Sequence, residues 1–285
     1  MKVCLAGYNV DTTVLRELQR ENPRSDATPE VLSAAYARIS RDPRAVNELR
    51  DEARKEIERA RKSNKTIIFK MGHHSVAEHA VFNFDIIGVS RLAMEEVEKF
   101  RLCSYTEKSQ RYITLEKGFV MPREIRGTRF EKPFLDLMDK QNGAYSYFVE
   151  ELKKYVFNKY KDLAANPKKH NLLEGWAKED ARYITALATE SQAGHTLNAR
   201  NLELLLRRFA SHPLREVQNL GREIYKEIAG VAPSIVLFHE ANDRDKNSYP
   251  DLKELTRKIM KPYSINENLY DNEVNLVEFT PDGDD

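Results

Sequence analysis

The segment from His73 to Tyr112 limits the fold of this chain more than any other stretch. It opens with a polar cluster, and an alternating run follows in which Phe82, Phe84 and Ile86 share one face. Alternation of this kind predicts a strand that is buried on one side. We therefore expect the rest of the fold to be organised around this segment.

A helix is expected to follow this strand. Gly88 should end the strand, and Ser90 is suited to cap the helix. The apolar positions of the helix are Leu92, Ala93, Val97 and Phe100. Its end delivers Lys99 and Arg101 to a polar turn over residues 104–112. So many hydroxyl and charged groups directly after an apolar helix favour a phosphate or nucleotide site over a core.

The charge balance argues against a general nucleic-acid binder. With 46 basic and 45 acidic residues the formal net charge is +1, whereas such proteins usually carry a clear basic excess. Two cysteines, Cys4 and Cys103, cannot form a disulfide framework, which favours the reducing cytoplasm. No run approaches the roughly 18 consecutive apolar residues of a membrane span, so no membrane partner is expected. The first residues are typical of a strand over 2–6 and not of a signal peptide.

Helices are expected to fill much of the remaining chain. Asp11 should cap a helix that runs to about Arg20, and Thr28-Pro29-Glu30 has the hydroxyl, proline and carboxylate of a helix start. An apolar stripe predicts one amphipathic helix over 44–62. The other expected elements are a helix over 134–163 with a break near Asn142 and Gly143, a polar connection over 187–196, a helix from Asn198, and a helix over 213–228.

The character of the chain changes near Asn242. Residues 242–285 are polar, with one short amphipathic piece at 252–260 and a last stretch, 274–283, that is typical of a strand and a turn. We expect a single domain over residues 1–241 and a C-terminal appendage over 242–285.

The polar cluster has two interpretations. His73, His74, Glu78 and His79 are residue types that bind metals, but their spacing is neither H-E-x-x-H nor H-x-x-E-H. Because no second cluster offers the missing ligand, the wall of a polar pocket is favoured and no metal is expected. Cys103 is likewise either a nucleophile activated by Arg101 or a small packing residue at a helix end.

Four arginines differ from the solvated ones around them. Guanidinium groups suit phosphate and planar acceptor edges. The alternative for each is an ordinary ion pair with a nearby carboxylate. The four are Arg111, Arg182, Arg200 and Arg208.

Together these residues resemble the flavin-dependent thymidylate synthases. The likeness covers roughly residues 34–232 in five ordered motifs. Ala37-Arg38-Ile39-Ser40 resembles the early A-R-x-S segment, and Gly72 to His79 resembles G-H-x-[ST]-x-x-E-H. Arg101 to Tyr112 resembles the second half of the family signature. Asp180-Ala181-Arg182 and Asn198-Ala199-Arg200 are similar to two further segments of the nucleotide and flavin sites.

The resemblance implies a fold, a reaction and an assembly. The fold is an α/β subunit of the α+β type, with a mixed sheet flanked by helices. The reaction is the methylation of dUMP to dTMP with FAD as cofactor, methylene-tetrahydrofolate as carbon donor and NADPH as reductant. The partners are dUMP and either further copies in a homotetramer or a second thymidylate-synthase-like chain. Because the flavin supplies the hydride, no protein nucleophile is needed.

The resemblance also implies roles for individual residues. Arg208 would be the catalytic arginine facing the uracil ring, with its neighbour Arg207 a rival for that role. The residues expected at FAD are Ser75, Lys99, Arg101, Glu107, Asn198 and Arg200. The residues expected at dUMP are Glu96, Lys99, Glu107, Ser109, Arg111, Arg182 and Arg208.

The signature departs from the family pattern at its start. The family has R-H-R preceded by a glutamine, whereas this chain has Lys99-Phe100-Arg101 preceded by Glu96. Lys99 keeps a charge but loses the bidentate fork, and Glu96 is placed one helical turn away to pair with it. Phe100 loses a hydrogen-bonding ring and offers a flavin or folate only a stacking surface. An alternative therefore stays open: a non-catalytic or altered family member that binds flavin or nucleotide beside a second chain.

Overall fold

The computed structural model describes residues 1–11, 28–38 and 46–260, and its sheet is built from four strands in the order β1-β2-β4-β3. The strands are β1 (Lys2–Tyr8), β2 (Val81–Ser90), β3 (Ser104–Glu107) and β4 (Glu190–Asn198). All three pairings are antiparallel, so the α+β class is confirmed while the predicted mixture of strand directions is wrong. Whether two strands run parallel or antiparallel depends on how the segment between them connects them. The residue pattern of a single strand does not predict this.

The register of β2 against β4 determines which face of the sheet is buried. Phe82 lies opposite Leu197 and Ile86 opposite Ala193, and all four side chains are buried. The register shifts between Ile87 and Val89, around Gly88 with its φ of 71°. The strand therefore continues through Gly88 to Ser90 as a bulge, and the prediction that Gly88 ends it is wrong.

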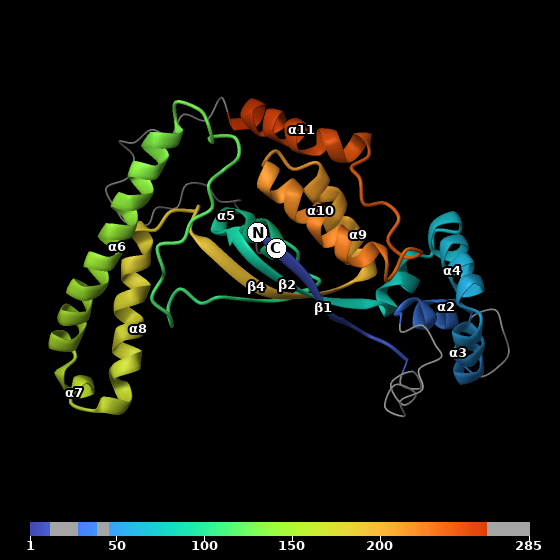
Figure 1. Ribbon diagram of the computed structural model, residues 1–285, viewed down its shortest axis with the longest axis horizontal. Coiled ribbons are helices and arrows are strands. Elements are labelled where there is room, and N and C mark those ends of the chain that lie inside the picture. The colour runs from blue at the N-terminus through green and yellow to red at the C-terminus, as the bar shows by residue number, and fades with distance from the viewer. Residues whose placement is uncertain (12–27, 39–45, 261–285) are drawn as a thin grey trace, which may run out of the picture.

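Helices cover one face of this sheet and leave the other open (Figure 1). The covering helices are α5 (Arg91–Glu98), α9 (Ala199–Ala210) and α10 (Arg215–Ala229). Ser90 caps α5 by accepting the Ala93 N–H, as predicted. Helix α9 begins directly after Asn198, close to the predicted start, and Asn198 caps it by accepting the Asn201 N–H. Leu202, Leu205 and Leu206 of α9 are buried in the core. On the open face Asn83 and Asp85 are exposed to solvent, as is common for antiparallel sheets.

The stretch predicted as a connection over 187–196 is the central strand β4. Its side chains alternate, with Ser191, Ala193 and His195 buried and Gln192 and Gly194 exposed. The sequence did not predict this strand, because its small and polar residues have low strand propensity. Pairing with β2 on one side and β3 on the other determines its conformation instead. The polar turn predicted after α5 likewise contains the short strand β3.

A long helical arm extends away from the sheet (Figure 1). It consists of α6 (Glu131–Lys159), α7 (Lys161–Ala164), η3 (Pro167–Lys169), α8 (His170–Ala181) and η4 (Arg182–Ile184). Helix α6 is continuous, so the predicted break at Asn142 and Gly143 is wrong. The exposed Gly143 lowers the stability of the helix only through its weak helix propensity. The buried side chains of Met138 and Tyr145 on either side hold the helix in place.

The N-terminal helices form a small lobe beside the sheet. They are α2 (Glu30–Arg38), α3 (Val46–Lys55) and α4 (Ile57–Asn64), followed by η1 (Lys65–Lys70) and η2 (His74–His79). The single helix predicted over 44–62 is wrong, because the chain leaves helical geometry at Glu56. The break directs Leu49 of α3 and Ala60 of α4 toward α2, with which they form one apolar cluster.

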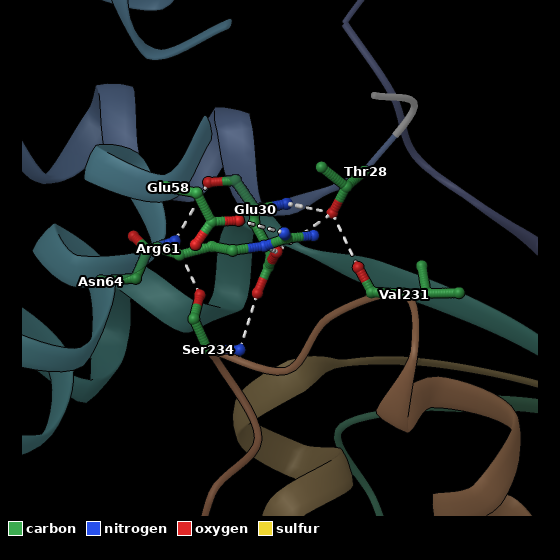
Figure 2. A network of polar contacts seen from close by, with 7 residues as sticks. All are labelled: Thr28, Glu30, Glu58, Arg61, Asn64, Val231 and Ser234. Atoms are coloured by element: carbon green, nitrogen blue, oxygen red, sulfur yellow. Dashed lines mark hydrogen bonds and ion pairs between the residues drawn. The ribbon is translucent and has the colours of Figure 1, made fainter. Parts of the chain in front are cut away.

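A buried polar network joins this lobe to the segment after α10 (Figure 2). Glu30 is fully buried; its Oε2 accepts from Arg61 Nε at 2.7 Å and its Oε1 accepts from the Ser234 N–H at 2.7 Å. Thr28 Oγ1 donates to the Val231 carbonyl at 2.9 Å, and Asn64 Nδ2 donates to the Glu30 carbonyl at 3.1 Å. The lobe is thus fixed by hydrogen bonds over about two hundred residues of sequence.

Beyond residue 242 the structure has one further helix, α11 (Asp243–Met260). Its side chains over 251–259 are all exposed. No helix in the described ranges is long and apolar enough to cross a membrane. The helix predicted from Asp11 to Arg20 and the strand and turn predicted over 274–283 lie outside the described residues.

Candidate functional site

Two of the predicted arginines converge on one carboxylate. Arg111 Nη1 and Arg182 Nη2 each lie 3.6 Å from Glu179 Oε1, one arginine coming from the loop after β3 and the other from the end of α8. Ser109 Oγ accepts from the backbone N–H groups of Arg111 and Tyr112 at 3.2 and 3.4 Å, which turns the loop toward α8. Two cations share one carboxylate through long, half-exposed contacts, so the cluster keeps a net positive charge.

A second group forms where η2, the turn after α5 and the start of α9 meet. Arg200 Nη1 contacts Glu78 Oε1 at 2.5 Å, which joins α9 to η2. Asn201 Nδ2 donates to the Leu102 carbonyl at 3.0 Å, which joins α9 to the turn that carries Arg101. Ser75, Arg101 and Arg200 are all exposed. These contacts bring the segments that carry Ser75, Arg101 and Arg200 close to the N-terminus of α9, where the helix dipole favours anions.

Glu107 lies between these two groups. It is half-buried on β3, where Arg91 Nη1 and Ser191 Oγ contact its two carboxylate oxygens. Burial raises the pKa of the neighbouring Glu98, and the negative charge of Glu107 raises it further. Glu107 is therefore positioned by two side chains, Arg91 and Ser191, that the sequence did not indicate.

The altered start of the signature is held by an internal salt bridge. Glu96 is buried; its Oε1 lies 2.5 Å from Lys99 Nζ and its Oε2 lies 3.4 Å from His212 Nε2. His212 Nδ1 accepts from the Leu214 N–H at 3.1 Å, so the ring proton is on Nε2 and points to Glu96. Burial lowers the pKa of His212 although Glu96 opposes that shift. The expected pairing of Glu96 with Lys99 is confirmed.

Phe100 is a core residue. It is 8% exposed and its ring meets Phe209 edge to face, with centroids 6.1 Å apart. The expectation that it offers a flavin or folate a stacking surface is therefore wrong. The apolar side of an amphipathic helix explains the position, since Phe100 continues the stripe of Ala93 and Val97.

The two arginines left open by the sequence have different surroundings. Arg207 Nε lies 3.8 Å from Asp245 Oδ2 and thereby connects α9 to the start of α11. Arg208 is exposed and its guanidinium lies 5.3 Å from the centre of the Phe100 ring. Arg208 is thus the one of the pair that faces the signature.

The contacts of the histidine cluster and of Cys103 bear on the two interpretations that the sequence left open for each: metal site or polar pocket wall for the histidines, and nucleophile or packing residue for Cys103. Glu78 is engaged by Arg200, while the His74 and His79 rings pack edgewise on Phe69 and Tyr36. Within the described residues no three metal-binding side chains come together. Cys103 Sγ contacts the Phe100 carbonyl at 2.9 Å, and burial raises the pKa of its thiol, which favours the packing role over the nucleophile.

Several side chains of this region were missed. Glu179 lies one helical turn before Arg182, a spacing that is visible in the sequence. Arg91 and Ser191 gave no such signal, because their contacts with Glu107 form only once β3 pairs with β4. His212 lies in the turn between α9 and α10, and only the tertiary fold brings it to Glu96.

Fold and site together define a class: an α+β subunit in which arginine-containing clusters lie beside an antiparallel sheet. The family profile described as "Thymidylate synthase complementing protein" matches residues 24–234, which is most of the chain. The chain belongs to this family.

Relatives and solved structures agree with the assignment. The chain is 31% identical to the flavin-dependent thymidylate synthase of Clostridium tetani over 74% of this chain and 82% of that protein. It is 31% identical to the enzyme of the same name from Geobacter sulfurreducens, over 59% of this chain and 65% of that protein, just under two thirds. A UMP/dUMP methylase from Streptomyces cacaoi with 5-Br dUMP shares the fold, with a TM-score of 0.53 and 17% identity over 82% and 92% of the two chains. The enzyme from Helicobacter pylori with FAD and dUMP gives 0.51 and 18% over 84% and 100%.

Proposed function

We propose that this protein is an FAD-dependent thymidylate synthase that methylates dUMP to dTMP, with methylene-tetrahydrofolate and NADPH as co-substrates. The observation that carries the proposal is the convergence of Arg111 and Arg182 beside the Ser109 turn. Two guanidinium groups held by one shared carboxylate suit a phosphate dianion, because a dianion neutralises both where Glu179 neutralises one. In this arrangement Ser109, Arg111 and Arg182 bind the phosphate of dUMP.

The flavin proposal rests on the second group. Arg101, Arg200 and the N-terminus of α9 offer positive charge on one surface, and Ser75 and Asn198 add polar groups beside it. This donor set fits the diphosphate of FAD. When bound, FAD supplies the hydride chemistry. The protein residues orient it: Arg101, Arg200 and Lys99 pair with its negative charge, and Glu107 accepts a hydrogen bond at the boundary between cofactor and nucleotide.

The proposed role of Arg208 concerns the pyrimidine. Its guanidinium is exposed next to the signature helix and has the aromatic face of Phe100 behind it. A fixed cation at this position stabilises negative charge that develops on a uracil ring. Glu96 and Lys99 complete the predicted nucleotide side of the site.

An assembly of identical subunits is part of the proposal. Four of the candidate arginines, Arg101, Arg111, Arg200 and Arg208, are exposed in one subunit, so ligands bound to them need walls that another copy can supply. Helix α6 supports this, since it carries large exposed apolar residues at intervals of two or three turns, which lie on one side of a helix. They are Leu137, Phe148 and Tyr155, and Phe130 at the N-cap of the helix continues the same spacing. We propose a homotetramer, located in the cytoplasm, whose catalytic domain spans residues 1–241 with 242–285 as an appendage.

A second candidate is a non-catalytic or altered family member that binds flavin or nucleotide and works beside a second thymidylate-synthase-like chain. The observation that favours it is the salt bridge in which buried Glu96 engages Lys99. Lys99 replaces the first arginine of the signature, and in this salt bridge its charge is paired with Glu96 and not with a ligand.

An anaerobic assay of dTMP formation separates the two candidates. The full chain is supplied with FAD, NADPH, dUMP and methylene-tetrahydrofolate, and each component is omitted in turn. Formation of dTMP that requires every component supports the first candidate. Binding of flavin without any formation of dTMP supports the second. In that event the double substitution Glu96→Gln with Lys99→Arg is expected to raise the rate. Phe100 is left unchanged, because a histidine there would bury a polar ring in the core.

A further inference from the structure

A groove on the outer side of α9 and α10 lies apart from the residues proposed for flavin and nucleotide. It encloses about 370 Å³, a volume within the range of small-molecule pockets. Its floor is formed by Leu206, Ala210 and Gly221, and its walls by Tyr225 and His239. A Cβ on Gly221 would lie 3.0 Å from the Phe209 Cβ, so α9 and α10 approach closely at the floor of the groove.

The aromatic wall of the groove is fixed before any ligand arrives. The rings of Tyr225 and His239 are stacked, with centroids 3.6 Å apart and planes at 21°. The segment that carries His239 is clamped onto α9, because Glu203 Oε2 accepts the N–H groups of both Leu237 and Phe238 at 3.2 Å. A preformed wall lowers the ordering cost of binding.

Positive charge lines the rim. Arg222 and Lys226 both border the groove and both are exposed. Lys226 is engaged by Glu223 at 2.5 Å. Arg222 makes no ion pair in the part of the chain that the structure describes, so its guanidinium is available to an acidic group. Glu240 borders the groove at its other end and disfavours a second negative charge there.

We propose that this groove is a second binding site, which takes a small planar aromatic compound with one acidic group. The aromatic ring packs against the Tyr225–His239 pair and the floor, and the acidic group pairs with Arg222. Charge complementarity selects an anion over a neutral aromatic compound, and the single available guanidinium selects one acidic group over several. The proposal is independent of the proposed synthase function.

Naphthalene-2-sulfonate is a suitable probe, titrated into the full chain by calorimetry with 2-naphthalenemethanol as its neutral analogue. The sulfonate is expected to bind saturably and the alcohol about tenfold more weakly or worse, as one charge-assisted contact is lost. Arg222→Gln should weaken the sulfonate by a similar factor. Ala210→Phe, which fills the groove from an exposed position, should abolish binding.

Two controls keep the result specific. Arg126→Gln removes an exposed arginine of the loop before α6 and should leave the sulfonate affinity unchanged. Saturating FAD and dUMP should not displace the probe, which separates this groove from the candidate site. The proposal is overturned by absence of binding, by equal affinity for sulfonate and alcohol, by unchanged affinity in Arg222→Gln and Ala210→Phe, or by displacement with FAD or dUMP.

Discussion

Two clusters of arginine and glutamate in this molecule use the same chemistry in opposite ways. Around Glu30 the carboxylate is fully buried, and both its oxygens accept short hydrogen bonds from Arg61 and the Ser234 N–H (Figure 2). Around Glu179 the carboxylate is half-exposed, and two arginines approach it only to 3.6 Å. The first cluster is saturated by its own chain, whereas the second retains capacity for a ligand.

The difference shows how to separate structural from functional charge in a chain with a net charge near zero. A buried carboxylate that has lost its hydration needs close partners, and removing one leaves a charge without compensation. An exposed, long contact contributes little to stability and is easily exchanged for a phosphate. Burial, and not residue type, thus identifies which ion pairs are available to a ligand.

The largest expected effect is on the buried cluster. Glu30→Gln removes the charge that compensates Arg61 and weakens the bond to the Ser234 N–H. We expect a loss on the order of 3 kcal/mol in the free energy of unfolding, measured by urea titration. Glu58→Gln, which removes the exposed second partner of Arg61, is the matched control and should change stability by no more than about 0.5 kcal/mol. Equal effects of the two substitutions would contradict the distinction.

His195 tests a buried group without partners. The ring faces the core from β4, neither nitrogen has a hydrogen bond among the described residues, and burial lowers its pKa from 6.5 to about 4. Because the unfolded chain takes up the proton first, stability is complete above about pH 6.5 and falls as the pH drops toward 4. The shift corresponds to about 3 kcal/mol. Urea titrations from pH 7 to 4 should show this fall in the natural chain and a smaller one in His195→Leu; identical slopes would refute it.

Arg182→Ala tests the exposed cluster. It should weaken dUMP by about 1.5–3 kcal/mol, the range for a charge-assisted hydrogen bond, and leave the weaker binding of deoxyuridine unchanged. Its unfolding free energy should stay within about 0.5 kcal/mol of the natural value. Calorimetry with both compounds measures the first effect. Equal weakening of dUMP and deoxyuridine, or a stability loss like that of Glu30→Gln, would assign Arg182 to the structural class.

The sequence predicted what is local and missed what depends on pairing across the fold. Ser90 was identified as a helix cap, Asn198 as the start of a helix, and Phe82, Phe84 and Ile86 as a buried face from alternation. Strand β4 was missed, since its sequence contains glycine and small polar residues and its conformation comes from two neighbouring strands.

The candidate site follows the same rule. Motif order singled out Arg111 and Arg182, which converge on Glu179, and one-turn spacing correctly paired Glu96 with Lys99. Phe100 was misread because a residue in a family motif was assumed to face the ligand, whereas its helix position directs it into the core. The contacts of Glu107 with Arg91 and Ser191 join three elements and have no signature in any one of them.

Titration of the full chain with FAD, followed by quenching of flavin fluorescence, tests the central claim most directly. We expect saturable uptake of FAD by the natural chain. Arg200→Ala should weaken uptake by about 1.5–3 kcal/mol through loss of one phosphate contact. Arg61→Ala is the control, since it disturbs the buried cluster and should reduce stability without lowering FAD affinity at a temperature where the protein stays folded. Absence of flavin uptake by the natural chain, or equal uptake by the natural chain and Arg200→Ala, would contradict the account.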